Sequence, residues 1–343
     1  MNFNRLKNIA VFCLLCKGIT LNKNIQEFMN KLAVVALGGN ALLRGNEIGT
    51  IQQQDRNTHN SCINLVDLVN KGINLVITHG NGPQVGNIFL RNDAGYSVYK
   101  IPKMPLDICV ADSQGGIGYM IEREMKNVLA ENEIKKNVLT LVTEVLVDEN
   151  DPAFERPTKP VGAFFMKEEA DLLSRNNNWM FKEDSQKRGW RRVVASPKPI
   201  EIINYKIIQN LAVEGNIVIT AGGGGVPVYK DKDNLFRGIE AVIDKDLASS
   251  LLASSIGADL FYILTDVSKV YINFNKPNQK ALDVVNVDEA QKLLDAGEFG
   301  EGSMAPKMRA AIEFIRNGGK ETIITDSAKL SDPGSGTRII SNN

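Results

Sequence analysis

The chain has 343 residues, 43% of them hydrophobic and 23% charged, which are values of a globular protein and exclude a disordered or fibrous one. Its 40 basic and 40 acidic residues leave no net charge, so we expect no general attraction to nucleic acid or to a membrane surface. Four cysteines do not suggest a disulfide framework in a chain of this size, and two histidines exclude a histidine-rich metal site. This composition favours a reducing, cytoplasmic location.

Residues 1–28 form an N-terminal extension in which basic residues surround an apolar run, Ile9–Cys16. This run is too short to span a bilayer, and no other segment is long and apolar enough to do so. The extension resembles a weak signal or organelle-targeting segment without a clean cleavage site, and Met29 is an alternative start. We therefore expect either a dispensable segment or an organelle-targeted protein.

From Leu32 onward, short apolar runs alternate with longer segments of helical period. Strands are predicted at Leu32–Leu37, Asn74–Thr78, Val138–Val147, Asn216–Thr220, Leu260–Thr265, Lys269–Ile272 and Glu321–Thr325. Helices are predicted at about 55–70, after Pro83, at about 107–132 and 200–214, and from about 244 and 304. This alternation predicts an α/β fold with a mainly parallel sheet between layers of helices. The period fails between about 148 and 191, which predicts a small lid-like subdomain outside the main sheet.

Three glycine-rich turns follow apolar strands, at Gly38-Gly39-Asn40, Gly80-Asn81-Gly82 and Gly222-Gly223-Gly224-Gly225. In a parallel sheet such turns lie at the carboxyl edge, where backbone N–H groups can approach an anion closely. A single one could be an ordinary tight turn, but three after strands favour phosphate binding. The sequence has no G-x-x-x-x-G-K-[ST] motif and no G-x-G-x-x-G after the first strand, which argues against a P-loop enzyme and a dinucleotide-binding dehydrogenase.

Two lysines are predicted in the first turns of helices, Lys245 between two aspartates and Lys307 before an amphipathic segment. A lysine there opposes the helix dipole, so an anion shared with the helix explains it better than helix stability does. Asp244 can cap the first of these helices. The alternatives are a solvated charge cluster at 244–246 and, for Lys159 between two prolines, an ordinary surface lysine.

Phosphoryl transfer requires such a set of groups. Its transition state spreads negative charge over the phosphoryl oxygens, and the protein must hold two anionic partners in line and neutralise that charge. Lysines, backbone N–H groups and Mg²⁺ suffice for this task. An acceptor oxygen that is already an anion needs no general base, which agrees with a chain containing only two histidines.

Several ordered segments resemble the carbamate kinases of the amino-acid kinase family. They are Val35–Ala41, Thr78–Gly86, Ser113–Tyr119, Pro157–Pro160, Gly222–Pro227, Val242–Asp246 and Gly302–Lys307. The resemblance runs from Lys31 to Ile340 and does not cover residues 1–28. It implies an open αβα sandwich with a carbamate or carbamoyl-phosphate lobe at 29–215, a nucleotide lobe at 216–343, and a protruding subdomain at about 148–191.

The resemblance implies the reaction ATP + carbamate ⇌ ADP + carbamoyl phosphate, run toward ATP in arginine degradation, in a homodimer. Mg²⁺ would accompany ATP or ADP, with no direct protein ligand. The implied catalytic residues are Lys159, Lys245, Lys307 and Asp246, which orients the lysines. The substrate-binding residues would be Gly38, Gly39, Asn40, Gly80, Asn81 and Gly82, and the nucleotide-binding residues Gly222, Gly223, Gly224, Gly225, Thr265 and Asp266.

Sister kinases carry a lysine just before the first Gly-Gly turn, where this chain has Ala36. Carbamate kinases also lack it, and the resemblance implies that Lys159 supplies this charge. The alternatives are an N-acetylglutamate, glutamate or UMP kinase, against which Ala36 and the subdomain argue, and a non-catalytic nucleotide-binding regulator. Retention of the three lysines and Asp246 argues against the regulator.

Overall fold

The computed structural model describes residues 31–43, 47–177, 179–184, 187–330, 332 and 334–342. The predictions for residues 1–28 therefore lie outside the described residues. The helices are η1 (Gly39–Ala41), α3 (Ile51–Asn70), α4 (Gly82–Tyr99), α5 (Leu106–Glu131), α6 (Lys167–Asn177), α7 (Tyr205–Val213), η2 (Gly222–Gly224), α8 (Lys245–Ser255), α9 (Val287–Asp295), α10 (Met304–Arg316) and η3 (Ser327–Lys329). None of these described helices is long and apolar enough to cross a membrane.

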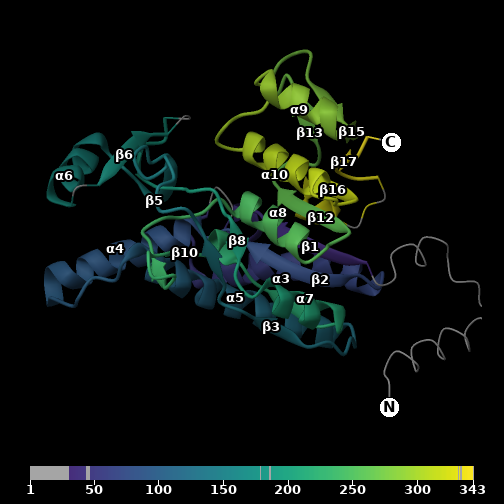
Figure 1. The fold of residues 1–343 in the computed structure, drawn as a ribbon, viewed down its shortest axis with the longest axis horizontal. Coiled ribbons are helices and arrows are strands. Elements are labelled where there is room, and N and C mark those ends of the chain that lie inside the picture. Colours follow the sequence, from purple (N-terminus) through teal and green to yellow (C-terminus); the bar gives the residue numbers. More distant parts are fainter. Residues whose placement is uncertain are drawn as a thin grey trace, which may run out of the picture.

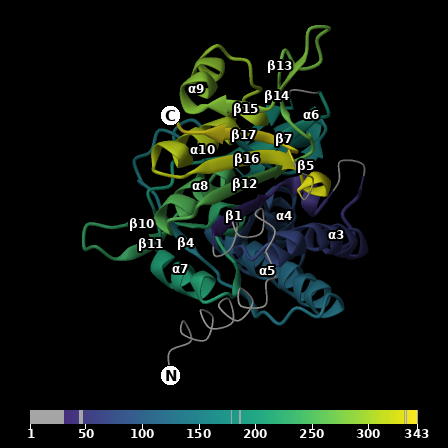
Figure 2. The ribbon, with the colours of Figure 1, turned by 90° about the vertical axis from the view of Figure 1, so that its right-hand side faces the viewer.

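Eight strands form the main sheet, in the order β15-β17-β16-β12-β1-β2-β9-β3. They are β1 (Leu32–Leu37), β2 (Asn74–His79), β3 (Val138–Thr140), β9 (Ile217–Ile219), β12 (Leu260–Thr265), β15 (Val284–Asn286), β16 (Glu321–Asp326) and β17 (Thr337–Ile340). All neighbouring strands are parallel except β16 and β17. The prediction of a mainly parallel sheet is confirmed, and Figure 2 shows β15 to β1 stacked as successive strands.

The central strand β1 is buried on both faces, as its uninterrupted apolar run predicts. Leu32, Val34 and Ala36 belong to a core shared with α7, α8 and α10, whereas Ala33, Val35 and Leu37 belong to a second core shared with α3 and α5. In Figure 2, α8 and α10 lie on one side of the sheet and α3 on the other. The αβα sandwich is therefore confirmed.

The predicted strand Val138–Val147 is wrong as a single element. It divides into β3 and β4 (Glu144–Leu146), and β4 joins a separate sheet of order β11-β10-β4-β8. The remaining strands of that sheet are β8 (Glu201–Ile202), β10 (Val226–Lys230) and β11 (Phe236–Gly238). The side chain of Gln114 on α5 binds both the N–H and the C=O of Thr143, at 2.9 and 3.1 Å, and so occupies the backbone groups between the two strands. The predicted strand Lys269–Ile272 likewise leaves the main sheet as β13 (Val270–Ile272), which pairs with β14 (Lys280–Leu282).

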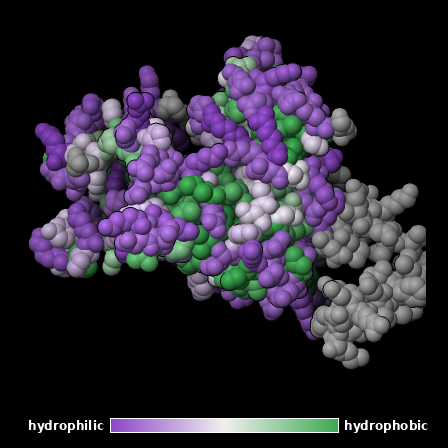
Figure 3. Space-filling view, in the orientation of Figure 1, coloured by the Kyte–Doolittle hydropathy of each residue, from purple (hydrophilic) through white to green (hydrophobic). Residues whose placement is uncertain are grey.

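The segment without a sustained period folds into a small subdomain. It contains β5 (Lys159–Phe165), α6, β6 (Met180–Glu183) and β7 (Trp190–Val194), with an antiparallel sheet of order β5-β7-β6. Its contact with α4 is aromatic, because the guanidinium of Arg192 lies 4.1 Å from the ring centre of Phe89 and 4.4 Å from that of Trp179. Figure 1 shows the subdomain above α4, and in Figure 3 it is a mostly hydrophilic lobe set apart from the part that carries α9.

Candidate active site

Four parallel strands end side by side at one edge of the main sheet. Leu37 at the end of β1 pairs with His79 at the end of β2, and Thr265 at the end of β12 pairs with Asp326 at the end of β16. Strands β1 and β12 are themselves neighbours. The two turns beginning at Gly38 and Gly80 and the pair Thr265-Asp266 therefore occupy the same edge, as expected for a ligand site in an open α/β sheet.

The turn after β1 lies close to the end of β12. A Cβ atom on Gly38 would lie 2.5 Å from the carbonyl oxygen of Leu264, so no larger residue fits without moving this backbone. Two side chains of α3 hold the turn from the other side: Ser61 donates to Ala41 O at 3.2 Å, and Asn57 donates to Leu42 O at 3.4 Å. Gly39 is open to the surroundings, whereas the side chain of Asn40 lies outside the described part of the chain.

Lys245 and Lys307 bind the same carboxylate. Lys245 Nζ lies 2.5 Å from Asp246 Oδ1, and Lys307 Nζ lies 3.0 Å from Asp246 Oδ2. Asp246 is only 3% exposed, in the first turn of α8, and Lys307 comes from the first turn of α10. The two helix starts predicted to carry lysines are thus adjacent, and both ammonium groups converge on one buried point.

Burial and charge pairing shift the pKa values of this group in opposite directions. Burial alone would raise the pKa of Asp246, but Lys245 and Lys307 outweigh it and hold the pKa well below its usual range. Burial lowers the pKa of Lys245 despite Asp246, and Lys307 lowers it further. For Lys307, burial is outweighed by Asp246, which raises the pKa. The group therefore holds one carboxylate charge between two ammonium charges and has positive charge left for an anion.

Lys159 reaches the same region from the subdomain. Its Nζ lies 2.5 Å from Asp244 Oδ2, and its side chain is 28% exposed. The other oxygen of Asp244 accepts hydrogen bonds from the N–H groups of Asp246 and Leu247, so the expected N-cap of α8 is confirmed. Lys159 is therefore linked through the start of α8 to the group formed by Lys245, Asp246 and Lys307.

Gly80 adjoins Lys245. A Cβ atom on it would lie 3.2 Å from Cδ of Lys245, so the turn after β2 packs directly against that side chain. Asn81 is buried and donates from Nδ2 to Ser113 Oγ at 2.8 Å, and Gly82 begins α4. The turn after β2 therefore brings the helix N-terminus of α4 to the edge that carries the lysines.

The first two of the four glycines at 222–225 pack against this second turn, and Gly224 and Gly225 pack against Ile243 and Val145. Cβ atoms on Gly222 and Gly223 would lie 2.2 Å from His79 Nε2 and 2.1 Å from Asn81 Nδ2, so only glycine fits there. The assignment of Gly222, Gly223, Gly224 and Gly225 to the nucleotide site stays a prediction. These glycines are not among the residues that line the large cavity of the described chain.

His79 is the buried histidine of the site. Its Nδ1 donates to Gly80 O at 3.0 Å, a direction that follows because a carbonyl oxygen only accepts. Burial lowers the pKa of His79 to about 4, and nearby Lys245 acts in the same direction. The ring is therefore neutral at ordinary pH, and it supports the turn after β2.

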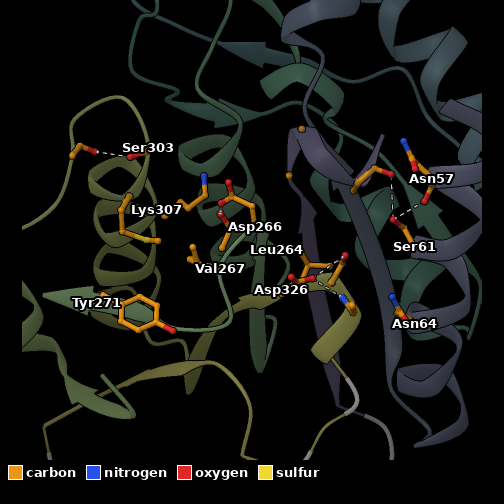
Figure 4. A pocket seen from close by; sticks show the side chains of 18 of the residues that line it. Asn57, Ser61, Asn64, Leu264, Asp266, Val267, Tyr271, Ser303, Lys307 and Asp326 are labelled. Atoms are coloured by element: carbon orange, nitrogen blue, oxygen red, sulfur yellow. Dashed lines mark hydrogen bonds between the residues drawn. The ribbon is translucent and has the colours of Figure 1, made fainter. Parts of the chain in front are cut away.

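A large cavity of about 1070 Å³ opens at the same edge of the sheet. Gly38, Thr265, Asp266 and Lys307 all line it, so it is continuous with the lysine group. Figure 4 shows Lys307 and Tyr271 on one side of the cavity and the α3 residues Asn57, Ser61 and Asn64 on the other. The remaining lining includes aromatic and carboxylate side chains, namely Phe274, Phe299, Glu298 and Asp326. Aromatic surface beside polar groups suits a nucleoside joined to phosphates.

The described residues contain no group of three or more His, Cys, Asp or Glu side chains that could hold a metal ion. The cavity does present two carboxylates. Asp266 follows Thr265, the last residue of β12, and Asp326 is the last residue of the neighbouring strand β16. Mg²⁺ is commonly bound by one or two carboxylates together with substrate phosphates and water. This donor set therefore fits a Mg²⁺ ion that enters with a nucleotide.

Sequence reasoning missed part of this site. It treated Asp244 only as a helix cap, and it did not find the α3 residues Asn57 and Ser61 or the aromatic residues Tyr271 and Phe274. The partner of Asp244 lies 85 residues away in sequence, so no local pattern indicates it. Tyr271 and Phe274 lie on and just after β13, outside the main sheet, so the strand pattern did not place them at this edge.

Comparisons with known proteins agree with this geometry. The family model described as "Amino acid kinase family" matches residues 31–326. A carbamate kinase of Pyrococcus furiosus is 46% identical over 301 residues, which cover 88% of this chain and 95% of that protein. Two solved structures of carbamate kinase from Giardia lamblia, bound to citric acid and to AMP-PNP, have TM-scores of 0.85 and 0.83 and identities of 43% and 44%; each comparison covers 91% of this chain and 99% of the other. The chain therefore belongs to the amino acid kinase family.

Proposed function

We propose that this chain is a carbamate kinase, which reversibly transfers a phosphoryl group between ATP and carbamate to give ADP and carbamoyl phosphate. The observation that carries this proposal is the convergence of Lys245 and Lys307 on Asp246, beside two glycine turns and a nucleotide-sized cavity. The identity of 46% to a carbamate kinase over most of both chains supports carbamate as the acceptor.

The nucleotide occupies the large cavity. Its base would contact Tyr271, Phe274 and Phe299, and its phosphates would extend toward Thr265, Asp266 and Lys307. The AMP-PNP bound to the relative from Giardia lamblia supports a nucleotide as ligand. Mg²⁺ bound to the phosphates would be held near Asp266 and Asp326, which replaces the expectation of no direct protein ligand, and it would neutralise part of the phosphate charge.

The carbamoyl phosphate lies on the other side of the transferring group. The turns Gly38-Gly39-Asn40 and Gly80-Asn81-Gly82 provide backbone N–H groups, and Lys159 provides a charge from the subdomain. Gly222 and Gly223 support this side, because they pack against His79 and Asn81.

The catalytic work is positioning and charge stabilisation. The carbamate oxygen is already an anion, so no side chain has to remove a proton from it. Lys245 and Lys307 neutralise charge on the transferring phosphoryl group, each through N–H donors not used by Asp246. Asp246 keeps the two like charges together and aims them, and its strongly lowered pKa makes it a poor proton acceptor.

The following statements also belong to this proposal. The reaction runs toward ATP in arginine degradation, the enzyme is a cytoplasmic homodimer, and residues 1–28 are dispensable or a targeting segment. The two lobes meet within the main sheet, between β1 and β12. We propose a lobe boundary later in the chain than 215 and 216, because β9 pairs with β2 and β3, and β10 pairs with β4, all of the first lobe.

The proposal is tested by incubating the purified protein with ADP and carbamoyl phosphate and coupling ATP formation to hexokinase and glucose-6-phosphate dehydrogenase. We expect ATP to form only when both substrates are present. The same protein with ATP and N-acetylglutamate, glutamate or UMP serves as the comparison. Activity with one of those acceptors, and none with carbamoyl phosphate, would assign a different kinase. Nucleotide binding without any transfer would indicate a regulator.

A further inference from the structure

Asp244 connects the protruding subdomain to the lysine group. One of its oxygens binds Lys159 Nζ at 2.5 Å, and the other accepts from Asp246 N at 2.9 Å and from Leu247 N at 3.3 Å. The side chain of Asp244 therefore fixes both Lys159, the first residue of β5, and the first turn of α8. Of the residues that the described structure brings to this lysine group, Lys159 is the one from the subdomain.

The pairing is placed where it can affect catalysis. Asp244 directly precedes Lys245 and Asp246, and an electrostatic contact between Asp244 and Lys307 contributes to the raised pKa of Lys307. The charges of Lys159, Lys245 and Lys307 would repel one another in this buried region, and the two aspartates hold them together. An ammonium group has three N–H donors, so binding one oxygen of Asp244 leaves Lys159 able to bind a phosphate as well.

We infer that Asp244 is a positioning residue, which holds Lys159 at the side of the site where carbamoyl phosphate binds. Its role as the cap of α8 is separate from this positioning role. The inference rests on the proposed function. An opposite role is also chemically conceivable: Asp244 could compete with the substrate anion for Lys159. The two roles predict opposite changes in the KM for carbamoyl phosphate.

The substitution Asp244→Asn separates the ion pair from the cap. Asparagine caps a helix about as well as aspartate, because its side-chain oxygen accepts the same N–H groups, but it carries no charge for Lys159. We expect the thermal midpoint and the Kd for ADP to stay close to wild type. The value of kcat/KM for carbamoyl phosphate should fall by about 10- to 100-fold, the range for a lost charge-assisted hydrogen bond. Asp171→Asn is the matched control, because it removes an Asp–Lys pair on exposed α6 of the same subdomain. It should leave the thermal midpoint, the Kd for ADP and kcat/KM for carbamoyl phosphate unchanged.

A double-mutant cycle with Lys159→Ala identifies the path of the effect. If Asp244 acts through Lys159, Asp244→Asn causes little further loss in the Lys159→Ala background. An equal loss in both backgrounds, an unchanged kcat/KM or a lower KM for carbamoyl phosphate would overturn the inference. These results are distinct from a failure of the proposed function, in which the wild-type protein itself would form no ATP from carbamoyl phosphate.

Discussion

A close contact between two glycines helps to set the position of the subdomain. A Cβ atom placed on Gly86 of α4 would lie 1.9 Å from Cα and 2.3 Å from N of Gly162 on β5. Ordinary contact begins at 3.4 Å, so Gly86→Ala must separate the two backbones by about 1.5 Å. Helix α4 begins at the turn after β2, and β5 begins at Lys159, so movement of either element displaces the acyl-phosphate side of the site.

A displacement of about 1 Å can cost about 100-fold in rate when reacting groups must be aligned. We therefore expect Gly86→Ala to lower kcat/KM for carbamoyl phosphate by about 100-fold, while the Kd for ADP changes little because no subdomain residue lines the nucleotide cavity of the described chain. Steady-state kinetics at saturating ADP measures the first quantity, and isothermal titration with ADP measures the second and also reports a folded protein.

Gly95→Ala is the matched control on the same helix. Its added methyl group would meet only side-chain atoms of Ile101, the nearest at 3.7 Å, which is ordinary contact. Both substitutions increase helix propensity equally, so their difference isolates the clash with Gly162. If Gly86→Ala were as active as Gly95→Ala, the subdomain position would not control catalysis, and this reasoning would be refuted.

Two further predictions concern the buried charges. Lys307→Ala should lower kcat by about 10²- to 10³-fold, the usual loss for one charge-stabilising donor, and turnover like that of the wild type would remove Lys307 from the mechanism. Asp246 has a folded-state pKa below its ordinary value of 3.8, so its ion pairs contribute stability that is present above about pH 4 and lost as the pH falls toward the folded value. Thermal midpoints between about pH 2 and 6 should therefore fall more steeply for wild type than for Asp246→Asn, and parallel curves would contradict this assignment.

Much of the fold follows from local sequence. The apolar run of β1 indicates a strand buried on both faces, and Asp244 marks the start of α8 within one residue. Long-range contacts explain the errors. Gln114 divides the predicted strand at 138–147, and the contact of Arg192 with α4 helps to order a subdomain whose own sequence has no clear period.

The lysine group was predictable because Lys245 and Lys307 each oppose a helix dipole, an arrangement that needs an anion to explain it. Their shared partner Asp246 was also named, but its contact with Lys307 spans 61 residues and required the structure. The packing of Gly222 and Gly223 was harder to predict. Glycine-rich turns at one sheet edge look alike in sequence, and the contacts with His79 and Asn81 span more than 140 residues.

The central claim is that Lys245, Lys307 and the glycine turns form one site in which a phosphoryl group is transferred between carbamoyl phosphate and ADP. Phosphorus-31 NMR of the protein with ADP and carbamoyl phosphate tests it most directly, because the donor and the γ-phosphate of ATP are observed together. We predict that the carbamoyl phosphate signal is converted into that of ATP by wild type and far more slowly by Lys245→Ala/Lys307→Ala. Conversion into inorganic phosphate alone, or equal rates of ATP formation in both proteins, would contradict the claim.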